Sequence, residues 1–207
     1  MKSKDLYKNI PLDQIPWIQE KPPKCLSESI KNLSTPPAKI LDIGCGIGNF
    51  SLYFAILGFK VTGIDISPTA IEIAHKNALS EKLDCNFIVS DFLKEMKILK
   101  EYADFAFDYE VLHHIFPEDR EQFVKNVDHC LKKGGCYLSI CFSEEEVYFG
   151  DKGKYRTTPF GTTLYFSSEQ EIKDLMSPYF NILELNTILI PGKQKEHQAI
   201  FCLMQKK

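Results

Sequence analysis

The chain has 207 residues, of which 44% are hydrophobic and 26% are charged, with a formal net charge of −3 and a sequence pI of about 6.0. This length and composition exclude a disordered or low-complexity protein and predict one globular domain over residues 1–207. The slight negative charge, without any long run of Lys or Arg, argues against a nucleic-acid partner.

The cysteine pattern and the length of the apolar runs indicate the cellular location. The seven cysteines are odd in number and show no Cys-x-x-Cys pair or zinc-type spacing, so we interpret them as reduced thiols. No apolar run approaches the roughly 18 residues of a membrane span, and the polar start, Met1 to Asp5, has no apolar signal core. We therefore expect no metal, no membrane partner and a cytoplasmic location, and the sequence leaves the oligomeric state open.

The first segment, residues 1–37, precedes the first strand and is predicted to form a helical cap on the core that follows. It contains a helix-like start, a proline-bracketed turn, the aromatic Trp17 and an amphipathic run at 25–33. The prolines of Ser34-Thr-Pro-Pro37 predict the turn that ends it.

Strands and helices alternate through the core, residues 38–207. Apolar and β-branched runs predict strands at 40–43, 60–64, 86–90, 104–109, 136–142, 182–190 and 198–204. Helices fit the intervals 50–57, 68–79, 117–131 and 167–176. This alternation predicts an α/β fold with a doubly wound, mostly parallel sheet. Because no helix separates the last two strands, they should form an antiparallel C-terminal hairpin at one edge of the sheet.

The stretch Asp42-Ile-Gly-Cys-Gly-Ile-Gly48 joins the first predicted strand to the first core helix. Glycines at alternate positions let the backbone approach a ligand closely. Acids fall at or just after the ends of the first four strands, and in a doubly wound sheet such ends meet at the ligand-binding edge. Without a Lys or Arg in the loop, this acidic edge disfavours a pyrophosphate. It favours a ligand that carries an ammonium, a sulfonium, ribose hydroxyls and an adenine amine.

The ordered motifs resemble the class I S-adenosylmethionine-dependent methyltransferases. After the glycine stretch come Gly63-Ile-Asp-Ile-Ser67, Ser90-Asp-Phe92 and Val111-Leu-His-His-Ile115, so that the resemblance covers about residues 38–142. It implies a Rossmann-like, seven-stranded sheet and S-adenosyl-L-methionine as the cofactor. The cofactor-binding residues that it implies are Asp42, Gly44, Cys45, Gly46, Gly48, Asp65, Ile66, Asp91, Phe92 and Glu110.

The resemblance also implies a role for each of these motifs. The glycine loop would pass under the methionine part of the cofactor, and Glu110 would lie near that part. Asp65 would accept from the ribose hydroxyls. Ile66 would pack on the adenine, while Asp91 would accept from the adenine amine with Phe92 beside it.

More loosely, Pro16-Trp17 and Pro159-Phe160-Gly161 resemble the small-molecule branch that includes thiopurine and tellurite methyltransferases. The connection at 143–166 exceeds usual loop lengths, which favours a functional loop near the substrate site. We therefore take Trp17, Tyr155, Arg156 and Phe160 as candidate substrate-binding residues. The alternatives are that Trp17 anchors the N-terminal segment and that the connection is a surface insertion.

Methyl transfer is an in-line displacement, which needs a base only when the acceptor is protonated. His113 and His114, three and four residues after Glu110, are the candidates for that base. With no third metal ligand in view, we interpret both as hydrogen-bonded structural residues, with a catalytic or metal-binding role as the alternative.

The predicted function is an S-adenosylmethionine-dependent methyltransferase acting on a small-molecule acceptor. Two alternatives come from other classes: a non-catalytic adenosyl-binding module and an NAD-type oxidoreductase. The second is disfavoured because Asn49 stands where a dinucleotide fingerprint has its third glycine.

Overall fold

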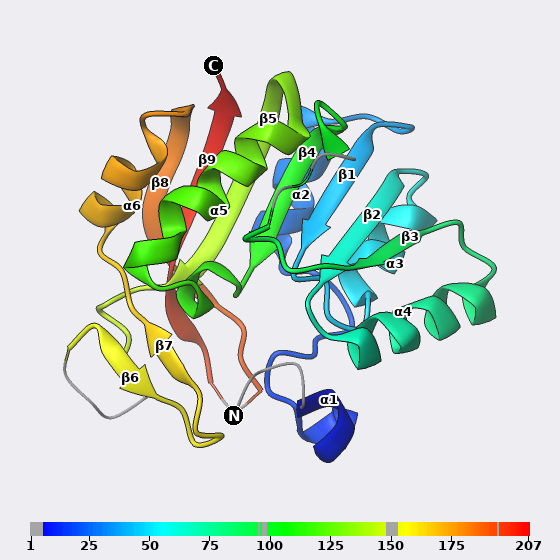
Figure 1. The fold of residues 1–207 in the computed structure, drawn as a ribbon, viewed down its shortest axis with the longest axis horizontal. Helices are drawn as coiled ribbons and strands as arrows, with labels where there is room; N and C mark the ends of the chain where they lie inside the picture. The colour runs from blue at the N-terminus through cyan, green and yellow to red at the C-terminus, as the bar shows by residue number, and fades with distance from the viewer. Residues whose placement is uncertain (1–5, 95, 97–98, 148–152, 194) are drawn as a thin grey trace.

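The computed structural model describes residues 6–94, 96, 99–147, 153–193 and 195–207. A seven-stranded sheet runs through it in the order β3-β2-β1-β4-β5-β9-β8 (Figure 1). The first five strands in the chain are parallel, and β9 pairs antiparallel with both β5 and β8. The strands are β1 (Lys39–Ile43), β2 (Lys60–Asp65), β3 (Asn86–Val89), β4 (Ala103–Tyr109), β5 (Leu131–Phe142), β8 (Phe180–Ile190) and β9 (His197–Lys206). This confirms the predicted fold class, including the closing hairpin.

Helices cover both faces of the sheet (Figure 1). On one face lie α2 (Lys24–Leu33), α3 (Asn49–Ile56) and α4 (Pro68–Glu81), and on the other lie α5 (Pro117–Cys130) and α6 (Glu169–Met176). Local chemistry explains two of the helix starts. Ser67 accepts from the Ala70 amide ahead of Pro68, and Ser168 forms a capping box with Glu171.

The core is split by the sheet into two apolar layers. Along β4, Phe105 and Phe107 belong to the layer under α2 and α3, whereas Ala106 belongs to the layer under α5 and α6. This is the alternation expected of a strand buried on both faces. The buried sheet fixes where its strands end, and those ends carry the site described below.

The connection between β5 and α6 contains a second, two-stranded sheet. Its strands β6 (Tyr155–Thr157) and β7 (Thr163–Tyr165) pair antiparallel, and β7 contacts the 3₁₀ turn η4 (Leu112–His114). From the sequence we expected only a long loop over 143–166, of which 148–152 lie outside the described residues. Strands of three residues are too short for an alternating pattern to identify. The N-terminal segment adds a short helix, α1 (Leu6–Asn9), and the 3₁₀ turn η2 (Leu12–Gln14).

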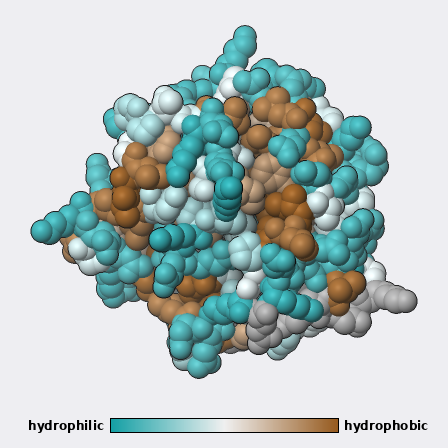
Figure 2. Space-filling view, turned by 180° about the vertical axis from the view of Figure 1, so that it is seen from behind, coloured by the Kyte–Doolittle hydropathy of each residue, from teal (hydrophilic) through white to brown (hydrophobic). Residues whose placement is uncertain are grey.

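The surface seen from behind is largely hydrophilic, with separate hydrophobic patches (Figure 2). Exposed apolar side chains of this scattered kind are normal in folded proteins, and they identify no interface. Within the described ranges, no helix combines the length and the apolar composition needed to cross a bilayer.

Candidate cofactor and acceptor site

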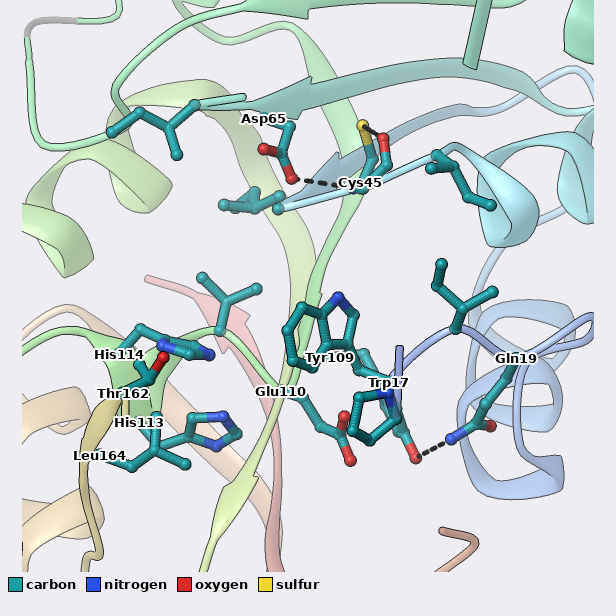
Figure 3. A pocket seen from close by; sticks show the side chains of 18 of the residues that line it. Trp17, Gln19, Cys45, Asp65, Tyr109, Glu110, His113, His114, Thr162 and Leu164 are labelled. Atoms are coloured by element: carbon teal, nitrogen blue, oxygen red, sulfur yellow. Dashed lines mark hydrogen bonds between the residues drawn. The ribbon is translucent and has the colours of Figure 1, made fainter. Parts of the chain in front are cut away.

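A cavity of about 680 Å³ lies where β1, β2, β3 and β4 end. Its volume falls within the roughly 300–1,000 Å³ that small-molecule sites occupy. Besides the strand ends, its walls come from the N-terminal segment, η4, the β6–β7 hairpin and the β8–β9 turn (Figure 3). The predicted ligand-binding edge of the sheet therefore carries a cavity of suitable size.

The loop after β1 needs glycine for two separate reasons. Gly44, Gly46 and Gly48 all have left-handed backbones, with φ of +74°, +54° and +82°. A Cβ at Gly44 would lie 2.3 Å from Val111 Cγ2, and a Cβ at Gly46 would lie 2.8 Å from the Tyr7 hydroxyl oxygen. Side chains are thus excluded by conformation and by close approach.

Asp65, at the end of β2, ties the glycine loop to the start of α4. Its Oδ2 accepts from the Gly46 amide at 2.9 Å, and its Oδ1 accepts from the Ser67 amide at 2.8 Å. Burial raises the pKa of this carboxyl, and backbone hydrogen bonds from Ser67, Gly46 and Ile66 oppose that rise. An ionised carboxylate has about four lone-pair sites, so about two stay available for a ligand that donates two hydroxyl protons.

Two further acids of the cavity wall have raised pKa values. Asp42 is buried and accepts from Ser51 Oγ at 2.6 Å, and burial raises its pKa to about 7. Burial likewise raises the pKa of Glu110 to about 8. In the described part of the chain, no side chain or amide hydrogen-bonds to the Glu110 carboxyl. A cationic ligand bound beside these groups would favour their ionised forms.

The turn after β4 aims Glu110 into the cavity (Figure 3). Glu110 has a φ of +62°, a left-handed backbone that is uncommon outside glycine, and its amide donates to the Ile140 carbonyl at 2.8 Å. A strained residue held by a neighbouring strand at the edge of a cavity is typical of a functional position.

The remaining predicted cofactor residues line the cavity, with one exception. Ile66 is 44% exposed at the end of β2, and Asp91 accepts from the Leu93 amide at 3.1 Å. Phe92 packs edge-on against Phe123, with ring centroids 5.3 Å apart. Cys45 also lines the cavity. The exception, Gly48, is not among the lining residues: a Cβ there would meet Phe87 and Ala74 instead.

The N-terminal segment and the β6–β7 hairpin meet over the other half of the cavity. Trp17 and Phe160 both line it, and their rings make an edge contact at 6.5 Å. The indole Nε1 of Trp17 donates to the Tyr7 hydroxyl at 3.0 Å, and Gln19 Nε2 donates to the Tyr109 hydroxyl at 3.3 Å. Two segments that are far apart in the sequence therefore form one cover.

Tyr155 and Arg156, which we expected at the substrate, do not line the cavity. Arg156 is only 4% exposed, and its guanidinium stacks on Phe166 at 4.2 Å. It donates to three backbone carbonyls, those of Glu144, Glu146 and Gly153. Tyr155 is 54% exposed and packs against other aromatic rings. The structure thus corrects the expectation for both residues: Arg156 fastens the connection internally, and Tyr155 faces outward.

The two histidines of η4 line the cavity side by side, with ring centroids 4.7 Å apart. His113 is buried, and its Nδ1 accepts from the Phe142 amide at 3.3 Å. Burial, reinforced by the charges of His114, Arg120 and His197, holds the pKa of His113 well below its ordinary value. Burial lowers the pKa of His114 to about 4. Among the described residues, no cluster of three or more His, Cys, Asp or Glu side chains has the geometry of a metal site.

Several lining residues were missed from the sequence, among them Tyr7, Gln19, Thr162 and His197. Tyr7 and Gln19 belong to no local motif, and only folding brings them to the glycine loop and to β4. His197 could have been found from topology, because an antiparallel β9 must begin at the edge where β5 ends. Its Nδ1 lies 3.3 Å from Glu146 Oε2.

Comparison with known proteins places this geometry in a family. A family model described as a methyltransferase domain matches residues 40–135. An uncharacterised methyltransferase of Schizosaccharomyces pombe is 33% identical over 117 residues, which span 56% of this chain and 77% of that protein. A ubiquinone biosynthesis O-methyltransferase of Glaesserella parasuis is 37% identical over 171 residues, spanning 72% and 71% of the two chains.

A solved structure agrees in fold over nearly the whole chain. It comes from a study of the conversion of a disulfide bond into a thioacetal group during echinomycin biosynthesis. It superposes with a TM-score of 0.81 at 20% identity and covers 99% of this chain and 91% of the other. This superposition agrees with the predicted fold, and the sequence matches confirm the predicted enzyme class and cofactor. The chain belongs to the class I S-adenosylmethionine-dependent methyltransferases.

Proposed function

We propose that the protein methylates a small molecule that binds in the half of the cavity covered by Trp17 and Phe160. The observation that carries this proposal is that one continuous cavity joins the acidic strand ends to that covered half. A cavity of this size accommodates a cofactor and a small second molecule, whereas a polymer needs an open groove.

The cofactor half supports a definite set of roles. Bound S-adenosylmethionine supplies a methyl group activated by its sulfonium charge. Gly44 and Gly46 would let the backbone pass under its methionine part, and Asp65 would accept from both ribose hydroxyls with its two remaining lone-pair sites. Asp42 and Glu110 would face the positive charges of the methionine part.

The adenine would lie on the β2 and β3 side of the cavity. Ile66 offers an exposed apolar surface for one face of the ring, with Phe92 beside it. Asp91 uses one carboxylate oxygen for the Leu93 amide, so that its other oxygen can accept from the adenine amine. The main contribution of these residues is to hold the donor in one orientation.

The charges around the cavity support a small molecule over a nucleic acid. Among the lining residues that the structure describes, Lys193 is the single Lys or Arg, and its Nζ donates to the Asp13 carbonyl. Phosphate backbones need several such cations. The Glaesserella relative, by name an O-methyltransferase of ubiquinone biosynthesis, supports the same acceptor class.

We further propose that residues 1–37 act as a cap on the core, residues 38–207. The segments that resemble the thiopurine and tellurite branch, Pro16-Trp17 and Pro159-Phe160-Gly161, contact each other over the acceptor half, which supports that finer placement. Closing such a cover would exclude water from the reacting atoms.

A transfer experiment tests the acceptor class. The protein is incubated with methyl-labelled S-adenosylmethionine and a cell extract, which is then separated into small molecules, RNA and protein. We expect enzyme-dependent label in the small-molecule fraction, and none with the Gly46→Val variant. Label that accumulates in RNA or protein instead would contradict the proposal.

A further inference from the structure

The two adjacent histidines of η4 differ in what their ring nitrogens can do. His113 Nδ1 accepts a hydrogen bond from the Phe142 amide, and the His113 ring stacks on the Phe142 ring at 4.3 Å with an interplanar angle of 7°. A backbone N–H can only donate, so Nδ1 carries the lone pair and the ring proton sits on Nε2. His113 therefore cannot take up another proton without losing its bond to β5.

His114 has the opposite character. Its amide donates to the Val111 carbonyl at 2.8 Å, which fixes its backbone, and its side chain lines the cavity. No hydrogen bond to that ring occurs within the described residues. Because burial lowers the pKa of His114 to about 4, the ring is neutral at physiological pH and keeps one basic nitrogen.

The charged groups near this pair act on His113 rather than on His114. Arg120 and His197 lower the pKa of His113, and Glu110, which precedes His114 by four residues in the chain, lines the same cavity. An ionised Glu110 would stabilise a positive charge that forms on His114. The site can therefore hold a proton transiently on His114 and lose it again to water.

The position of His114 is on the acceptor side of the cavity. Figure 3 shows His113, His114, Thr162 and Leu164 on one side, with Asp65 and Cys45 across the cavity from them. The Thr162 hydroxyl is buried without a hydrogen-bond partner in the described structure. In this half, the His114 ring and the Thr162 hydroxyl are thus two polar groups that have no hydrogen-bond partner among the described residues.

Apolar and aromatic side chains also line this half. They include Trp17, Phe160, Phe142, Leu164 and Ile115. Aromatic walls stack well on flat rings, and a hydroxyl beside a neutral imidazole suits an uncharged group that can both donate and accept a hydrogen bond.

On the basis of the proposed function, we propose that the acceptor is a flat, uncharged organic molecule with a reacting O–H or N–H, and that His114 is the base that takes its proton. The acceptor oxygen or nitrogen forms a bond to the methyl carbon. The carbon–sulfur bond breaks with its electron pair moving to sulfur, which becomes a neutral thioether. The acceptor proton moves to the free nitrogen of His114, and the resulting imidazolium loses it to water.

Two aromatic probes separate the role of a base from a structural role. A phenol is protonated at about pH 7 and needs a base, whereas an acidic thiophenol is already a thiolate and needs none. We expect His114→Gln to slow methyl transfer to the phenol by about 100-fold or more while changing transfer to the thiophenol by less than about threefold. The matched control is His75→Gln: His75 is exposed on α4 and outside the cavity lining, so both rates should be unchanged.

Nitrogen-15 spectra of the imidazoles, recorded on the full chain with S-adenosylhomocysteine, provide a second readout that needs no acceptor. We expect His113 to carry its proton on Nε2 and His114 to stay neutral at about pH 6. Equal slowing of both probes by His114→Gln, or a proton on His113 Nδ1, would overturn the assignment. If the wild-type protein methylates neither the phenol nor the thiophenol, the proposal of a flat aromatic acceptor is wrong. If label from S-adenosylmethionine is transferred to RNA or protein instead, the proposed small-molecule function itself is wrong.

Discussion

Replacing Asp65 by alanine tests the cofactor assignment at its most specific contact. The carboxylate uses two lone-pair sites on the Gly46 and Ser67 amides, and we expect the other two to accept from the ribose hydroxyls. Losing a charged acceptor in a desolvated cleft costs about 1–3 kcal/mol of binding free energy. Affinity for S-adenosylmethionine should therefore fall by roughly 5- to 150-fold.

The same substitution should also lower the free energy of unfolding. Two amides lose a charged partner, each bond being worth about 1.5–3 kcal/mol, while the variant no longer buries a carboxylate whose pKa is raised by desolvation. These effects oppose each other, and we expect a net loss of about 2 kcal/mol.

Calorimetric titration and urea unfolding measure the two effects separately. Asp65→Asn, which keeps one acceptor oxygen, should lie between the wild type and Asp65→Ala in both assays. A folded Asp65→Ala protein that binds S-adenosylmethionine with wild-type affinity would refute the ribose assignment.

Four further perturbations test other parts of the site. Gly46→Val places a Cβ 2.8 Å from the Tyr7 hydroxyl in a residue whose φ is +54°. Circular dichroism should show a folded protein, and titration should show that it no longer binds the cofactor. Normal binding would mean that the glycine loop is only a turn and does not contact the cofactor. Arg156→Met removes the donor to three carbonyls and should lower the unfolding free energy by about 3 kcal/mol without changing KM. An unchanged free energy of unfolding together with a raised KM for the acceptor would mean that Arg156 binds the substrate after all. The positive charge of bound S-adenosylmethionine should lower the pKa of Glu110 from about 8. Binding of S-adenosylmethionine at about pH 7 should therefore release a proton from Glu110, and the affinity for this ligand should rise with pH up to about pH 8. Glu110→Gln should reduce that release to the part that comes from Asp42, as measured in two buffers of different ionisation enthalpy. Release equal to that of the wild type would disprove the assignment. Deleting residues 1–21 should leave the sheet folded but slow methyl transfer by more than about tenfold, because Trp17 covers the cavity. Full activity of the truncated protein would argue against a role for residues 1–37 as a cap.

Most of the sheet was predictable because its order follows from local patterns. Mostly apolar strands such as β1 and β4 are buried on both faces, and the helices between parallel strands make the connections right-handed crossovers. The β6–β7 hairpin was not predictable, because its strands are three residues long and β7 packs against η4, which is distant in the sequence.

The site was predictable wherever topology alone places a side chain. Asp65 and Glu110 reach one edge because parallel strands end together. Arg156 was misjudged because a loop arginine looks the same in sequence whether it faces a ligand or folds back onto backbone carbonyls, and only packing separates the two. Tyr7 was missed because its contact with Gly46 joins segments about 40 residues apart without any motif.

The most direct test of the account is calorimetric titration of the full chain with S-adenosylmethionine, S-adenosylhomocysteine and NAD. The acidic strand ends, the glycine loop without a basic residue and the two free lone-pair sites of Asp65 predict that the first two ligands each bind at one site per chain and that NAD does not. Preferential binding of NAD, or no binding of S-adenosylmethionine, would contradict the account.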